Sequence, residues 1–248
     1  MSREFEIRRE VELPGTPEQV FDAVATGNGT AGWMFPTGEG APEAVGEEFA
    51  GHTVTALDRP WHFAVRVDGE DGWFNSLEYR IERHGNGAIL RYVHSGVMTG
   101  DWDTQYDGAD RHTDFYLHSL GEYLAHFAGR PVTYVGADGP ADALGDDAFA
   151  AVRAALRIGD GAAVGDSVDV DLPGIGRVRG EIDYLNDMFV GVRGEDALYR
   201  FYGRGRMGMP VFAGHHLFAQ GVDGDAARAA WTDWLAEVIS AAAPTGSA

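Results

Sequence analysis

The chain has 248 residues and carries 39 acidic side chains against 19 basic ones, all of them arginine, for a formal net charge of −20. Because it contains no cysteine and no lysine, it cannot form a disulfide scaffold, a thiolate metal site, a Schiff base or a P-loop, and its acidity argues against groove binding to nucleic acid. No apolar run is long enough to cross a bilayer, and the charged N-terminus lacks a signal-peptide core, so we expect a cytoplasmic protein without a membrane span.

The first half is predicted to form a strand, a helix, an antiparallel meander and a second, long helix. Apolar and charged side chains alternate from Phe5 to Leu13, which predicts a strand with one buried face. Thr16-Pro17-Glu18 is typical of a helix start, because threonine caps, proline suits the first turn and an acid favours the positive end of the helix dipole. An apolar loop follows at 32–36. Four strands are then expected at 45–54, 61–67, 73–83 and 88–97.

The long helix is expected to begin after Asp110 and to end at Gly129, because its apolar residues are spaced three, four and three positions apart. These residues are Leu117, Leu120, Leu124 and Phe127. A sheet of consecutive hairpins has one face free, and this amphipathic helix is its natural cover.

The second half repeats this element order in shorter form. A helix with Phe149, Val152 and Leu156 comes first, strand-like runs follow between residues 167 and 219, and a helix containing Trp231 and Trp234 closes the chain. Ala163-Val164-Gly165-Asp166 also echoes Ala44-Val45-Gly46-Glu47. We interpret this as an internal duplication whose second copy has lost its first strand.

The first copy resembles the START-like, or SRPBCC, helix-grip family, and within it the domains named after the activator of heat-shock protein 90 ATPase. The resemblance is carried by the segment 9–24 (REVELPGTPEQVFDAV), Gly32-Trp33, Val45-Gly46, Asp58-Arg59-Pro60 and the long closing helix. It implies a curved antiparallel sheet gripping the helix over a cavity that often holds an apolar molecule.

We therefore expect an α+β chain of two tandem helix-grip (START-like) units, each an antiparallel sheet wrapped on a long C-terminal helix, the second lacking the opening strand. The expected boundaries are a first unit at 1–130, a linker at 131–145, a second unit at 146–243 and a tail at 244–248.

Aromatic side chains with polar tips are frequent in the first unit, and such rings suit a mostly apolar pocket with a few oriented donors. The competing interpretation is that they fill the core. We favour binding of a lipophilic small molecule, without covalent chemistry, between the meander and the helix around Leu117, in a role that could be regulatory. The expected ligand-binding residues are Trp33, Phe35, Phe63, Trp73, Tyr79, Tyr92, His94, Leu117 and Leu120.

His94 is the one weak candidate for catalysis, because a histidine in a pocket can titrate near neutrality. With a nearby aspartate it would serve a cyclase- or dehydratase-like enzyme, although a hydrogen-bonded core histidine is the competing interpretation. A third hypothesis is a module that binds and regulates a protein partner such as a chaperone ATPase. Histidines and acids do not recur at metal-ligand spacings, and we expect neither a metal nor a cofactor.

Overall fold

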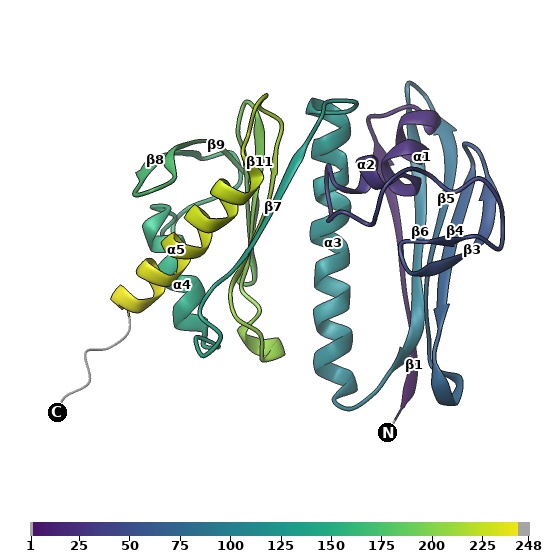
Figure 1. Ribbon diagram of the computed structural model, residues 1–248, viewed down its shortest axis with the longest axis horizontal. Helices are drawn as coiled ribbons and strands as arrows, with labels where there is room; N and C mark the ends of the chain where they lie inside the picture. The colour runs from purple at the N-terminus through teal and green to yellow at the C-terminus, as the bar shows by residue number, and fades with distance from the viewer. Residues whose placement is uncertain (1, 243–248) are drawn as a thin grey trace. The chain divides into compact units, whose positions relative to one another are not determined.

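The computed structural model describes residues 2–242, so the tail expected at 244–248 lies outside the described residues. Two compact units, Met1–Pro131 and Val132–Ala248, make up the chain. Each contains a six-stranded antiparallel sheet and a long C-terminal helix, which confirms the expected α+β class (Figure 1). None of the helices in the described range is long and apolar enough to cross a membrane.

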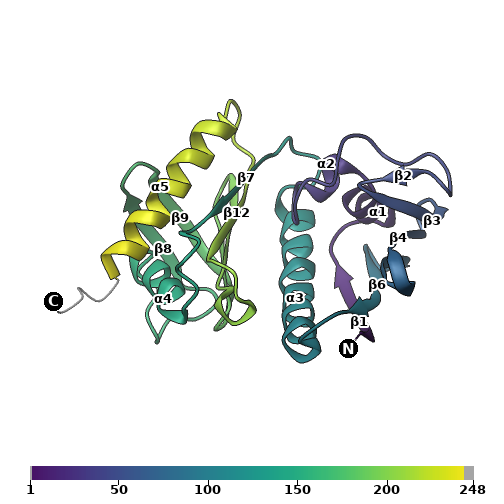
Figure 2. The same cartoon turned by 60° about the horizontal axis from the view of Figure 1, so that its bottom comes forward.

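Unit 1 has the strand order β1-β6-β5-β4-β3-β2. Its elements are β1 (Arg3–Leu13), α1 (Pro17–Ala25), α2 (Gly27–Thr30), β2 (Glu48–Phe49), β3 (His52–Asp58), β4 (His62–Asp68), the short 3₁₀ turn η1 (Glu70–Gly72), β5 (Phe74–His84), β6 (Gly87–Met98) and α3 (Trp102–His126). The helices α1 and α2 lie together at one end of α3 (Figure 2).

Local sequence explains where the helices of unit 1 begin. At the start of α1, Thr16 and Gln19 form a capping box in which each side chain accepts the other's backbone N–H. The helix α3 begins nine residues earlier than expected, because Asp101 caps it by accepting the backbone N–H of Thr104 at 3.3 Å. Hydrogen bonds from Thr104, chiefly through its hydroxyl, lower the pKa of Asp101.

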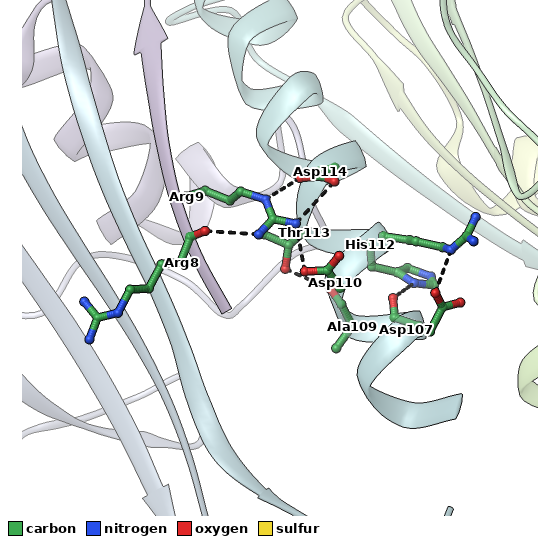
Figure 3. Close-up of polar contacts among 10 residues, drawn as sticks. Arg8, Arg9, Asp107, Ala109, Asp110, His112, Thr113 and Asp114 are labelled. Carbon is green, nitrogen blue, oxygen red and sulfur yellow. Dashed lines mark hydrogen bonds and ion pairs between the residues drawn. The ribbon is translucent and has the colours of Figure 1, made fainter. Parts of the chain in front are cut away.

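Arg9 joins β1 to α3, and Figure 3 shows its guanidinium reaching the helix. Nη2 donates to Asp110 at 2.8 Å and Nε donates to Asp114 at 2.6 Å. These carboxylates raise the pKa of Arg9, the hydrogen bond to Asp114 being the largest cause. Asp110 and Asp114 therefore lie inside the helix, where they connect α3 to β1 through Arg9.

Unit 2 has the corresponding strand order β7-β12-β11-β10-β9-β8. Its elements are β7 (Thr133–Asp138), α4 (Asp146–Ala155), β8 (Ser167–Leu172), β9 (Gly176–Leu185), β10 (Phe189–Arg193), β11 (Ala197–Tyr202), the 3₁₀ turn η2 (Gly205–Met207), β12 (Phe212–Leu217) and α5 (Gly224–Ala242). Its core packs Trp231, Trp234 and Leu235 of α5 among apolar side chains of the sheet.

The expectation that the second unit lacks its opening strand is wrong. The segment expected to be a linker contains β7, which pairs with β12 along its whole length. Gly136 makes this six-residue strand resemble a loop in sequence, because glycine weakens strands. In the sheet it lies opposite Gly214, and the rings of Tyr134 and Phe212 approach the position where its Cβ would be.

The two units also share the connection that enters their outer strands. Gly46 donates its N–H to Val54 O at 2.8 Å, and Gly165 donates its N–H to Ile182 O at 2.9 Å. Both glycines have positive φ, 92° and 96°, which a residue without Cβ adopts at little cost. In each unit the carboxylate of the acid that follows the glycine accepts the backbone N–H of the alanine that begins the motif. The short sequence echo therefore corresponds to the same turn.

Candidate functional site

Unit 1 contains an apolar cavity of about 260 Å³ between the segment after α2 and the strands β3 to β5. The strands and their connections contribute Phe49, Ala50, His52, Phe63, Val65, Leu77 and Tyr79 to its wall. The helical end contributes Val24, Thr30, Met34, Phe35, Pro36 and Thr37. No aspartate, glutamate or arginine lines it, although the chain carries a net charge of −20.

Three of the expected ligand-binding residues, Phe35, Phe63 and Tyr79, come together in this wall. Phe63 and Tyr79 lie opposite each other on β4 and β5, with nearly parallel rings whose centroids are 6.1 Å apart. Phe49 meets Phe63 edge-on at 6.3 Å. Phe35 is 45% exposed and stands at the opening of the cavity.

Trp33 does not line the cavity. Its side chain is 2% exposed, and its Nε1 donates to Ala23 O at 2.9 Å, so it joins the core that connects α1 to the segment after α2. The apolar loop at 32–36 therefore divides between two roles. Trp33 faces the core, whereas Phe35, two residues later, faces the cavity.

Four other expected residues also lie outside the cavity wall. Leu117 and Leu120 are buried on α3. Tyr92 is buried opposite Tyr79, and Thr113 hydrogen-bonds its side chain. Trp73 packs its ring against Gly69. The cavity thus lies to one side of the place expected for it, against β3 to β5 rather than beneath Leu117.

His94 lies on β6 directly opposite Leu77, which lines the cavity. Its Nε2 is 3.1 Å from Asn75 Nδ2, and Phe5 meets its ring edge-on at 4.9 Å. Burial lowers the pKa of His94 to about 4, so the ring is neutral at pH 7. Within the described part of the chain no carboxylate contacts it. The aspartate that the sequence-based hypothesis paired with His94 for acid–base catalysis is therefore not found beside it.

The other lining residues were not expected as ligand contacts from the sequence: Val24, Thr30, Met34, Pro36, Thr37, Phe49, Ala50, His52, Val65 and Leu77. Met34 and Pro36 belong to the apolar loop at 32–36, so their position beside Phe35 in the sequence could have indicated that they line the cavity. Leu77 follows the alternation of β5, two residues from Tyr79 and on the same face. His52 had no such signal, because its place depends on a turn in which its Nδ1 lies 2.9 Å from Ala50 O.

The polar atoms of the cavity are few. The hydroxyls of Thr30 and Thr37 bond each other at 2.8 Å. Burial alone raises the pKa of Tyr79, so its phenol stays protonated. One imidazole and no carboxylate line the wall, which does not supply the three converging ligands that a protein metal site requires. This arrangement suits an uncharged, largely apolar molecule.

No family model matches this chain. No curated protein matches it either. Among solved structures, the Aha1 dimer from Colwellia psychrerythraea is 21% identical and covers 48% of this chain and 96% of its own, with a TM-score of 0.40. Bacillus halodurans protein BH1534 is 26% identical and covers 50% and 99%, with a TM-score of 0.40. DynU16, from the dynemicin biosynthetic locus, is 15% identical and covers 95% and 96%, with a TM-score of 0.41.

Proposed function

We propose that unit 1 binds a small, uncharged, apolar molecule in the cavity behind Phe35. The observation that carries this proposal is the composition of the wall, which brings together four aromatic rings and no charged side chain. These rings are Phe35, Phe49, Phe63 and Tyr79. A ligand that covers apolar surface in the cavity lowers the binding free energy by roughly 25 cal/mol for each Å² that it removes from water.

The size of the cavity limits the ligand. At about 260 Å³ it is slightly smaller than the range of roughly 300–1,000 Å³ typical of drug-sized ligands. It therefore suits a compact molecule of one to three rings. An anion is disfavoured, because no arginine lines the wall and the rest of the chain is strongly acidic.

The neutral fluorescent probe N-phenyl-1-naphthylamine tests the proposal with the full chain. Phe35→Ala removes the ring at the opening, and we expect it to weaken binding by about 1–3 kcal/mol. Leu77→Trp fills the cavity and should abolish binding. Trp61→Ala is the matched control, because Trp61 is 42% exposed, close to the 45% of Phe35, and lies outside the cavity wall.

Probe binding that is the same in the wild type, Phe35→Ala and Leu77→Trp would place the probe elsewhere and overturn the proposal. Extraction of the purified chain with organic solvent, followed by mass spectrometry, then identifies any molecule that co-purifies. Loss of that molecule in Leu77→Trp, with retention in Trp61→Ala, is the expected outcome.

The surroundings of His94 support binding rather than acid–base catalysis. A general acid or base works best when its pKa is near the operating pH, whereas burial lowers the pKa of His94 to about 4. An enzyme of the cyclase or dehydratase type would instead show turnover that His94→Ala abolishes while probe binding remains.

A further inference from the structure

His94 is not part of the cavity wall, but it lies next to Leu77, which is, and its side chain is on the same face of the sheet. The face contains Phe63 and Val65 on β4 and Tyr79 and Leu77 on β5, all of which line the cavity. His94 is the next residue along the same cross-strand row, paired with Leu77. Side chains directly opposite each other in an antiparallel pair have Cβ atoms about 5 Å apart. Asn75, Leu77 and His94 all remain partly exposed, so solvent or a ligand reaches this row.

The contact with Asn75 fixes which nitrogen of His94 carries the proton. An amide Nδ2 is a donor only, so His94 Nε2, 3.1 Å away, accepts. With its pKa lowered to about 4, the ring holds a single proton at neutral pH, and that proton is on Nδ1. In the described part of the chain Nδ1–H has no hydrogen-bond partner.

The second unit provides an internal comparison. His215 lies on β12 opposite Val135, as His94 lies on β6 opposite Ile7. Its Nδ1 accepts the backbone N–H of Arg200 at 3.1 Å, and the ring of Trp231 meets it at 4.2 Å. His215 is completely buried. The histidine at this position of the fold is thus fully buried in unit 2, whereas in unit 1 it is partly exposed and its Nδ1–H is available to donate.

We propose that His94, held by Asn75, donates its Nδ1–H to an uncharged oxygen acceptor, such as a ketone, on the molecule in the cavity. This inference rests on the proposed function and specifies the ligand class. The acceptor is uncharged because a neutral imidazole does not neutralise a carboxylate, and no arginine lines the cavity to do so. The apolar body of the ligand lies against Leu77 and Tyr79, and its oxygen points along the row to His94.

Two probes of nearly equal shape test the inference with the full chain. 2-Acetylnaphthalene has a ketone oxygen and 2-ethylnaphthalene has none. We expect the wild type to bind the ketone about 3- to 10-fold more tightly, as one net hydrogen bond gives. His94→Phe should remove this preference and retain binding of 2-ethylnaphthalene. His62→Phe is the control: His62 neighbours Phe63 in β4 and so points to the opposite face of the sheet, where it pairs with Glu78.

Asn75→Asp tests the role of the amide without removing the ring. Its carboxylate accepts from Nε2–H, so at pH 8 the proton moves from Nδ1 to Nε2 and the preference for the ketone should disappear. Nitrogen-15 NMR of the imidazole reports this change of tautomer directly.

The outcomes separate this inference from the proposed function. Equal binding of the two probes by the wild type, or a ketone preference that survives His94→Phe or Asn75→Asp, overturns the inference and leaves the cavity assignment standing. If neither probe binds, the proposed function fails and the inference fails with it.

Discussion

At the scale of single residues, His94 links pH to stability. Its pKa is lowered to about 4 in the folded chain and is about 6.5 when unfolded. The neutral ring therefore favours the folded state above pH 6.5, and this contribution is lost as the pH falls from 6.5 towards 4. We expect the wild type to lose roughly 1–2 kcal/mol more unfolding free energy than His94→Asn between pH 7.5 and pH 5. Urea denaturation of both chains at the two pH values measures the difference, and parallel losses would show that His94 is solvated.

Because Trp33 belongs to the core and not to the cavity wall, we expect its substitutions to change stability. Because the ring is buried and its Nε1 bonds Ala23 O, Trp33→Ala should cost about 3–5 kcal/mol of unfolding free energy. Trp33→Phe restores most of the volume and leaves the Ala23 carbonyl without its donor, so we expect a smaller loss of about 1–3 kcal/mol. Thermal and urea unfolding provide the measurement. If Trp33→Ala leaves the stability unchanged and weakens probe binding, Trp33 lines the cavity and its assignment to the core is wrong.

At the scale of elements, Arg9 tests how α3 is held on the sheet. The side chain of Arg9 is 27% exposed, and those of Asp110 and Asp114 are 34% and 47% exposed, so solvent weakens both ion pairs. We expect Arg9→Met to cost about 1 kcal/mol or less at low salt, and less still at 0.5 M NaCl. A double-mutant cycle with Asp114→Asn isolates the pair. Its control is Arg8→Met, because Arg8 bonds Glu6 on its own strand and touches neither acid. A coupling energy of zero would mean that apolar packing alone positions the helix.

The elements show how far periodicity carries prediction. Strict alternation in Phe5 to Leu13 gave β1 its bounds within two residues, because one face of that strand is buried. The start of α3 was missed because Asp103, Asp107 and Asp110 interrupt the apolar spacing, while the cap that decides the start is a single side chain. The strand β7 was missed because it is held by pairing with β12, whose residues lie 74 to 84 positions further along the chain, and local composition does not encode that pairing. The cavity likewise depends on how a loop meets a sheet, so Phe35, Phe63 and Tyr79 were the lining residues expected from the sequence, and the apolar loop and the alternation of β5 indicated only a few more.

At the scale of the whole molecule, charge determines the response to salt. With 39 acids against 19 arginines, repulsion among the acidic side chains opposes the compact state. Each exposed ion pair adds little stability in compensation. Because the Debye length falls from about 10 Å at 0.1 M salt to about 3 Å at 1 M, screening relieves more repulsion than it removes attraction. We therefore expect 0.5 M NaCl to raise stability by about 1 kcal/mol relative to 0.05 M, which corresponds to roughly 2–4 °C in Tm.

Choline chloride at the same ionic strength is the control for this salt effect. It screens charge as NaCl does and presents a bulky cation that carboxylates do not coordinate closely. Equal rises in Tm with the two salts indicate general screening, and a larger rise with NaCl assigns part of the effect to sodium held by the acidic surface. A fall in Tm with both salts contradicts the expectation. Attraction within ion pairs such as Arg9 with Asp110 and Asp114 would then outweigh the repulsion among the remaining acids.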